Sequence, residues 1–141
     1  MDAADRELVA DIFACLGHEA RLAILEGRQN ERSMTAIASD LGMQRGSLQD
    51  HIERVIDCGL VYRPETGSQT YALTPLGRYL LEVVEDEGEI VASVLHQQEE
   101  LAQQIRESLD DVALSETERE RAVTRETWEQ LADSFDTLPE D

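Results

Sequence analysis

The chain has 141 residues, enough for one core domain with a helical extension and too few for an enzyme with separate cofactor and substrate lobes. Its 31 acidic and 12 basic residues give a formal net charge of -19, and every basic residue is an arginine. This balance predicts a high-salt cytoplasm, where screening weakens the repulsion between carboxylates and arginine takes over the pairing role of lysine.

No targeting or membrane-spanning segment is expected. Residues 1–5 are acidic where a signal peptide is positive, and the longest uncharged apolar run, residues 90–95, is too short to cross a bilayer. Cys15 and Cys58 lie far apart in the sequence and have no CxxC or metal-ligand spacing, so no disulfide framework is expected. These features predict a soluble cytoplasmic protein.

Apolar residues at helical spacing predict two helices at the start of the chain. The first covers residues 5–16, and the second covers residues 18–26, with Gly27 just beyond its C-terminus. The polar residues 28–32 are the expected loop after it. The first helix carries an apolar stripe made of Leu8, Val9, Ile12, Phe13 and Leu16.

Two further helices are predicted before residue 60. Ser33 is the expected N-cap of a third helix, which Gly42 closes. A fourth helix follows after a short turn and ends at Gly59. Its inward face is expected to consist of Leu48, Ile52 and Val55.

From residue 60 the hydrophobic pattern changes to the two-residue period of a β-strand. Residues 60–63 and 70–73 flank a turn over residues 64–69, a pattern that predicts a small β-hairpin. Helical period resumes afterwards, with Thr74 as the cap and Pro75 in the first helical position, where its missing N–H is harmless.

A heptad pattern predicts that the next helix is long and pairs with another helix. One row of core positions is Val84, Val91, Gln98, Ile105 and Val112, and the other is Leu80, Glu87, Val94, Leu101 and Ser108. Glu87 and Gly88 interrupt the pattern and predict a kink or a break into two stacked helices. Residues 115–118 form a capping box that opens a last helix. The apolar residues expected to pack back from it onto the dimer helices are Trp128, Leu131 and Phe135, and Val123 lies on the same face.

The order of these elements predicts a mainly α fold with a small β-hairpin wing, that is, a winged helix-turn-helix domain over residues 1–84. Residues 85–135 are the predicted dimerisation region, built from the long helix as a coiled coil, and residues 136–141 are a predicted flexible acidic tail.

Four short segments carry recognisable motifs: LGHEARLAIL at residues 16–25, IASDLG at 37–42, CGLV at 58–61 and YALTPLGR at 71–78. In this order they resemble the ArsR-like family of transcription regulators. Residues 16–25 resemble the opening of the family, and residues 37–42 look like the first helix and turn of its DNA-binding motif. Its recognition helix and the segment after it are matched by Leu48, His51, Ile52 and residues 58–61, and residues 71–78 are similar to the junction that follows its wing. The resemblance covers about residues 8–84 and implies a DNA-binding regulator of haloarchaeal type.

In such a domain the fourth helix lies in the major groove, and the hairpin tip reaches the phosphates or the minor groove. Arg45 can pair with guanine, Gln49 with adenine, and Asp50 can accept from cytosine. The predicted DNA-binding residues are Gln44, Arg45, Ser47, Gln49 and Asp50 on the helix, and Arg63, Gln69 and Arg78 as phosphate contacts beside the hairpin. The chain departs from the family pattern at three of the helix positions: Gln44 replaces a serine cap, Gly46 loosens the first turn, and Asp50 stands where Arg or Gln is frequent.

The charge of the chain is unevenly distributed. Residues 28–78 hold six acids and six arginines, so the predicted DNA-reading part is neutral, whereas residues 76–141 hold nineteen acids and five arginines. In molar salt the release of counterions adds little affinity, so recognition would depend on base contacts, DNA shape and cations that bridge Asp50 to phosphate.

No metal or cofactor is expected. The long helix carries a weak metal-site pattern made of Asp86, His96 and Glu99. The favoured interpretation is a solvated helix face. His51 is interpreted as a packing residue. For Cys15 and Cys58 two interpretations stay open, a redox switch that alters DNA binding and, as the favoured one, two small buried hydrophobic residues.

Catalysis is not expected, because the sequence has no Ser/His/Asp set and no phosphate-binding glycine loop. The predicted function is a sequence-specific transcription regulator that binds double-stranded DNA as a homodimer through its C-terminal helices. The alternative is a winged-helix adaptor of the transcription apparatus that does not read DNA. Its acidic face, Asp50, Glu53 and Asp57, would meet a basic protein.

Overall fold

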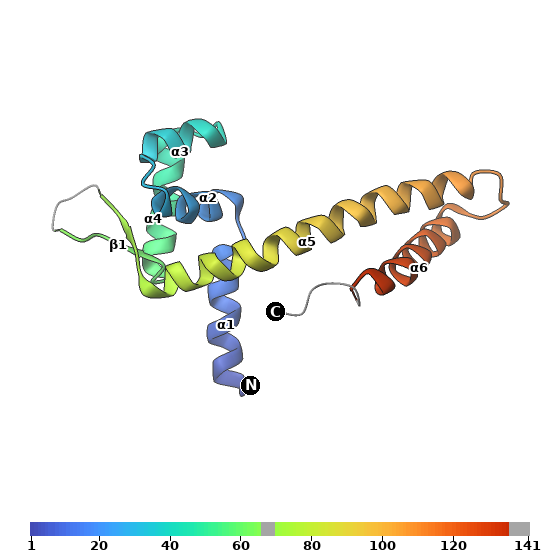
Figure 1. Ribbon diagram of the computed structural model, residues 1–141, viewed down its shortest axis with the longest axis horizontal. Coiled ribbons are helices and arrows are strands. Elements are labelled where there is room, and N and C mark those ends of the chain that lie inside the picture. Colours follow the sequence, from blue (N-terminus) through green and yellow to red (C-terminus); the bar gives the residue numbers. More distant parts are fainter. Residues whose placement is uncertain (66–69, 136–141) are drawn as a thin grey trace. The chain divides into compact units, whose positions relative to one another are not determined.

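Figure 1 shows a computed structural model of the protein, which describes residues 1–65 and 70–135, with side chains described as far as residue 132. The elements are α1 (Ala3–Leu16), α2 (Glu19–Gln29), α3 (Met34–Leu41), α4 (Arg45–Asp57), β1 (Val61–Tyr62), β2 (Ala72–Leu73), α5 (Pro75–Ser108) and α6 (Glu116–Phe135). The prediction of a mainly helical chain with a small hairpin and a long helix is confirmed. The chain divides into two units, Met1–Glu85 and Asp86–Asp141, and α5 belongs to both. The predicted tail, residues 136–141, lies outside the described residues.

α1 begins earlier than predicted because Asp2 caps it. Oδ1 of Asp2 accepts a hydrogen bond from the Asp5 N–H at 2.9 Å. Only the end of the apolar stripe reaches the core, since Leu16 is buried, whereas Leu8 and Phe13 are 69% and 55% exposed. Most of the stripe is therefore uncovered within one chain.

The prediction that Gly27 ends α2 is wrong, because Gly27 lies inside the helix and is buried. A Cβ atom here would lie 2.4 Å from Cδ1 of Ile37, so the glycine allows α3 to pack closely on α2. The helix closes later, where Glu31 adopts the left-handed region with φ of 58° and the Arg32 N–H donates to the Gly27 carbonyl at 2.8 Å. The predicted loop over residues 28–32 is shorter because its first two residues are helical.

The predicted boundaries of α3 are confirmed. Oγ of Ser33 accepts from the Ala36 N–H at 3.1 Å, and Gly42 ends the helix in the left-handed region with φ of 64°. α4 ends in a similar way, with Gly59 at φ of 80° after the C-cap residue Cys58. The predicted inward face of α4 is also confirmed, with Leu48, Ile52 and Val55 buried.

β1 and β2 form the predicted antiparallel hairpin, in which Val61 lies opposite Leu73 and Tyr62 opposite Ala72. Thr74 caps α5 as predicted. Its Oγ1 accepts from the Gly77 N–H at 3.0 Å and donates to the Gly59 carbonyl at 2.6 Å. One side chain thus joins the end of α4, the hairpin and the start of α5.

The first turn of α5 lies directly against the backbone that enters β1. A Cβ atom at Gly77 would lie 2.0 Å from the Leu60 carbonyl oxygen, so this contact requires glycine. The same oxygen accepts from the Thr74 N–H at 3.0 Å. The core of this unit contains fifteen buried residues: Cys15, Leu16, Ile24, Leu25, Met34, Ile37, Ala38, Leu48, Ile52, Val55, Leu60, Val61, Tyr71, Leu80 and Leu81.

The predicted kink or break at Glu87 and Gly88 is wrong, because α5 runs without interruption for 34 residues. A glycine lowers helix propensity, but unlike proline it keeps its backbone N–H donor, so the helix continues through it. None of the helices in the described parts of the chain is long and apolar enough to cross a membrane.

In the second unit α6 folds back along the last turns of α5 (Figure 1). Ser115 opens α6 as predicted, since its Oγ accepts from the Glu118 N–H at 3.2 Å. Arg106 and Glu120 join the two helices through two hydrogen bonds of 3.0 and 3.2 Å. The buried residues among those described in this unit are Val94, Ala102, Val123, Thr127 and Leu131.

Some apolar residues of α5 are therefore covered within the single chain, and others are not. Val94 is buried in the second unit, whereas Val91 and Leu95 are 55% and 51% exposed. Of the predicted packing residues on α6, Leu131 is buried and Trp128 is 43% exposed, and the Phe135 side chain lies outside the described residues.

Candidate functional site

The leading end of α4 is an exposed helix N-terminus. Gln44, Arg45, Gly46 and Ser47 are all exposed, and Asp50 is exposed one turn further along. Gln44 is the N-cap residue, and within the described residues its side chain makes no capping hydrogen bond to the first turn. A Cβ atom at Gly46 would meet nothing within 4 Å. A ligand can therefore approach the first turn of α4 closely.

Tyr71, just before β2, brings two of the predicted residues together. Its hydroxyl oxygen accepts from Nε2 of Gln49 at 3.3 Å and from Nη2 of Arg63 at 3.3 Å. The Arg63 guanidinium also lies over the Tyr71 ring, 5.3 Å from its centroid, in a cation–π contact. Tyr71 is 5% exposed, so its ring is anchored in the core while the hydroxyl joins α4 to the hairpin.

Arg28 fixes the backbone of the same tyrosine. Its Nε donates to the Tyr71 carbonyl at 2.8 Å, and its Nη1 donates to the Arg32 carbonyl at 2.8 Å. The sequence analysis assigned no role to Tyr71 or Arg28. A tyrosine just before a short strand is a weak signal by itself, and two of its three partners, Gln49 and Arg28, lie 22 and 43 residues away in the sequence.

The remaining hairpin residues are not part of this cluster. Arg78 lines a separate hollow of about 530 Å³ between the hairpin and α5, together with Tyr62, Leu73, Tyr79 and Glu82 among others. Gln69 lies outside the described residues. Gln49 and Arg63 are thus brought together with Tyr71, whereas Arg78 faces a different part of the surface.

The outer face of α4 is acidic beyond its first turn. Asp50, Glu53 and Asp57 are exposed, as the spacing predicted. The neutral amides and Arg45 stand at the leading end, and the carboxylates follow toward the C-terminus. An anion is therefore favoured at the leading end and disfavoured further along the helix.

His51 packs in a small cluster at the start of α2. Its ring centroid lies 4.2 Å from that of His18, and its Nδ1 accepts from Nε of Arg21 at 3.4 Å. His18 caps α2, since its Nδ1 accepts from the Ala20 N–H at 3.1 Å. Burial lowers the pKa of His51, and the nearby charges of His18 and Arg21 lower it further, while Asp50 opposes the change. These contacts agree with the interpretation of His51 as a packing residue.

The two cysteines, far apart in the sequence, lie side by side in the fold. The Cys15 thiol donates to the Arg54 carbonyl at 3.8 Å, and Cys58 lies close enough to raise its pKa. Cys15 is fully buried, and Cys58 is half-buried. Burial is the main cause that raises the pKa of Cys15 to about 12, and contact with Cys58 raises it as well. The sequence did not predict this pairing.

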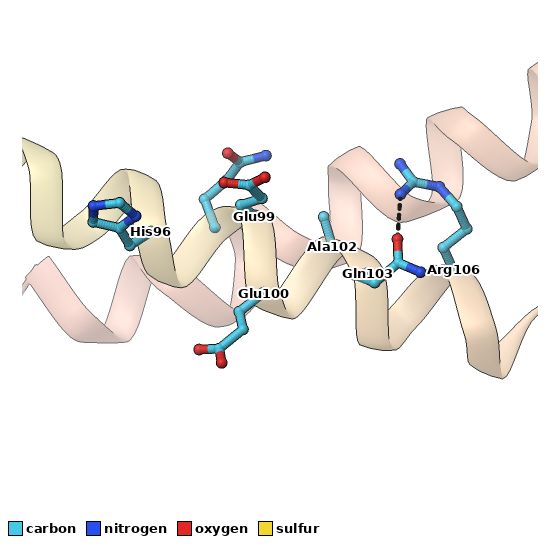
Figure 2. Close-up of a pocket in the computed structure, with 7 residues that line it drawn as sticks. His96, Glu99, Glu100, Ala102, Gln103 and Arg106 are labelled. Carbon is cyan, nitrogen blue, oxygen red and sulfur yellow. Dashed lines mark hydrogen bonds between the residues drawn. The ribbon is translucent and has the colours of Figure 1, made fainter.

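A hollow of about 680 Å³ on α5 contains two of the residues with a weak metal-site pattern, His96 and Glu99. Figure 2 shows that Glu99 and Glu100 leave the helix in opposite directions and that Arg106 donates to Gln103, at 3.1 Å. Among the described residues, no group of three or more His, Cys, Asp or Glu side chains is arranged to hold a metal ion.

No protein-family model, no curated protein and no solved structure matches this chain.

Proposed function

We propose that the protein is a winged helix-turn-helix transcription regulator that binds double-stranded DNA as a homodimer in a high-salt cytoplasm. The observation that carries the proposal is the joined surface of α4 and the hairpin. The open first turn of α4, with Arg45 and Ser47, lies on the same helix as Gln49, and Gln49 shares the Tyr71 hydroxyl with Arg63.

This surface suits the edge of a major groove. An α-helix fits in the groove, and its exposed N-terminal residues reach base edges while its backbone N–H groups favour phosphate. Arg45 and Ser47 are the proposed base-reading residues, and the open space at Gly46 allows close approach. Gln49 and Arg63, tied to one tyrosine, set the spacing between the base-reading helix and a phosphate contact.

The charge distribution is compatible with this proposal. Residues 28–78 carry equal numbers of acids and arginines, so this region does not repel DNA through a net charge of its own. In molar salt the remaining acids are screened within about 3 Å. Specificity would then come from direct contacts more than from counterion release.

The proposed dimer contact uses the C-terminal helices. Val91 and Leu95 on α5 and Trp128 on α6 remain about half exposed within one chain. A second copy could cover these residues, including Val91, a heptad core position that the single chain leaves exposed. Two-fold symmetry would then present two α4 helices to successive turns of DNA.

Two arginine substitutions test the proposed roles. Arg45→Ala is expected to relax the preference at one base position, at a cost of about 1–3 kcal/mol for the preferred base. Arg63→Ala is expected to weaken binding to all sequences to a similar degree. It should also reduce the steepness with which the logarithm of the binding constant falls with the logarithm of salt concentration, by about 1. The measurement is selection from a random duplex library in molar KCl, followed by fluorescence anisotropy with the selected duplexes.

Arg125→Ala is the matched control, because it removes the same charge from an exposed position on α6. It should bind as the unmodified chain does. Unaltered binding by both Arg45→Ala and Arg63→Ala would refute the assigned roles. If the unmodified chain selects no sequence, the adaptor alternative gains support, since its exposed acidic face of Asp50, Glu53 and Asp57 suits a basic protein partner.

A further inference from the structure

The only two cysteines of the chain meet where the end of α1 touches the end of α4. The Cys15 sulfur lies 3.8 Å from the Arg54 carbonyl oxygen, and the same oxygen accepts from the Cys58 N–H at 3.1 Å. Cα atoms of α1 and α4 approach within 8 Å. The Arg54 carbonyl is thus shared by the Cys15 thiol and the backbone N–H of Cys58.

We propose that Cys15 and Cys58 form a reversible intramolecular disulfide, which links α1 to the C-terminal end of α4 in response to a peroxide. This proposal goes beyond DNA binding, because the bond can form whether or not the protein reads DNA. It specifies the redox switch that the sequence left open beside the interpretation of Cys15 and Cys58 as two small buried hydrophobic residues.

The difference in exposure assigns the two sulfurs different parts in the reaction. Cys58 is half-buried and can meet a small oxidant, whereas Cys15 is fully buried and its raised pKa, about 12, keeps it protonated. Cys58 thiolate attacks one oxygen of the peroxide, giving a sulfenic acid, and the released hydroxide takes up a proton to become water. The Cys15 sulfur then attacks the Cys58 sulfur, and the sulfenic oxygen leaves as water with the Cys15 proton. In total, two thiols and one hydrogen peroxide give one disulfide and two waters.

Forming this bond gives up only one long hydrogen bond of the Cys15 thiol. The Cys15 thiol gives up a long hydrogen bond of 3.8 Å to the Arg54 carbonyl, and that oxygen keeps its bond from the Cys58 N–H. The disulfide would close a loop of 43 residues, which contains α2, α3 and α4. Closing a loop of this length restricts the unfolded chain, so the melting temperature is expected to rise by on the order of 10 °C.

The test uses the full chain in molar KCl, treated with hydrogen peroxide, then denatured and alkylated with N-ethylmaleimide. The untreated protein should take up two alkyl groups. The treated protein should take up none and should lose the mass of two hydrogens. Trypsin cuts after arginine except before proline, so the linked peptides should be residues 7–21 and 55–78. Dithiothreitol should restore both thiols and the lower melting temperature.

Cys58→Ala is the control, and Cys15→Ala is a second control in case one variant folds poorly. After peroxide, Cys58→Ala should keep Cys15 as an alkylatable thiol, whereas Cys15→Ala should carry Cys58 as a sulfenic acid that has no internal thiol to react with. Neither variant should form an internal disulfide or show the rise in melting temperature. The proposal is overturned if the treated protein keeps two reactive thiols, joins two chains through a disulfide, or forms sulfinic acid at Cys58 with Cys15 still reduced. If the chain forms the internal disulfide but binds no DNA in either redox state, the disulfide proposal is supported and the proposed DNA-binding function is refuted.

Discussion

Tyr71 holds together the groups on which the proposed reading surface depends. Its ring is buried in the core, its carbonyl accepts from Arg28, and its hydroxyl accepts from Gln49 and Arg63. Because a buried ring has few alternative rotamers, the hydroxyl is a fixed point between α4 and the hairpin. Gln49 therefore acts first as a positioning residue, and any base contact it makes must coexist with this bond or replace it.

His51 gives the protein a stability that depends on pH. Its folded-state pKa is below the ordinary value of 6.5, so the unfolded chain binds a proton more readily than the folded chain. The stabilising contribution is present above pH 6.5 and is lost progressively as the pH falls from 6.5 through the lower folded-state pKa. Protonation would also break the hydrogen bond from Arg21, which needs an unprotonated Nδ1.

Urea unfolding between about pH 7.5 and 5.5 checks this prediction, because most carboxylates stay ionised in that range. The free energy of unfolding should fall toward pH 5.5, and His51→Gln should make the slope shallower. His96→Gln is the matched control at an exposed position on α5 and should keep the original slope. An unchanged slope in His51→Gln would contradict the assignment.

Helix ends account for much of how the first unit is built. Ser33, Gly42 and Thr74 could be predicted from the sequence because caps act through residues only three or four positions away. Gly27 could not, because its role depends on Ile37 of the next helix. The contacts between Gln49 and Tyr71 and between Cys15 and Cys58 likewise depend on packing that no local pattern records.

Two glycines in the first turns of helices should respond in opposite ways to the same substitution. Gly77→Ala would place a methyl group 2.0 Å from the Leu60 carbonyl oxygen, a backbone atom that cannot move without disturbing the hairpin. It should lower the free energy of unfolding by about 1–3 kcal/mol. Gly46→Ala meets nothing within 4 Å and should raise it by about 0.5–1 kcal/mol through helix propensity.

Denaturant titrations of the two variants under one salt condition measure the difference. Equal changes in both would mean that the close contact between α5 and the Leu60 carbonyl does not constrain the fold. Since Gly46 lies at the proposed DNA surface, the added methyl group should also weaken DNA binding although it stabilises the chain.

At the scale of the whole molecule, charge and apolar surface are divided between different parts of the sequence. The acids are concentrated after residue 76, whereas residues 28–78 are neutral. Exposed apolar side chains remain on α1, at Leu8 and Phe13, and on α5, at Val91 and Leu95. In a chain with so much charge, exposed apolar patches of this kind are surfaces that a second copy can cover.

The sequence could predict which residues are apolar along α5, but not which of them the chain covers by itself. Val94 is buried in the second unit, and its neighbour Leu95 is half exposed, although both are apolar. α6 folds back along α5 (Figure 1), and which α5 residues it covers depends on packing between the two helices, which the apolar pattern of α5 alone does not record.

The central claim is that two copies of this chain read duplex DNA together. The most direct measurement is footprinting of genomic fragments that the full chain selects in molar KCl, with light scattering on the same sample to give its mass. We expect a dimer and protection of two inverted half-sites about one helical turn apart, 10–10.5 base pairs from centre to centre. A monomer, or a chain that enriches no fragment over random DNA, would contradict the claim.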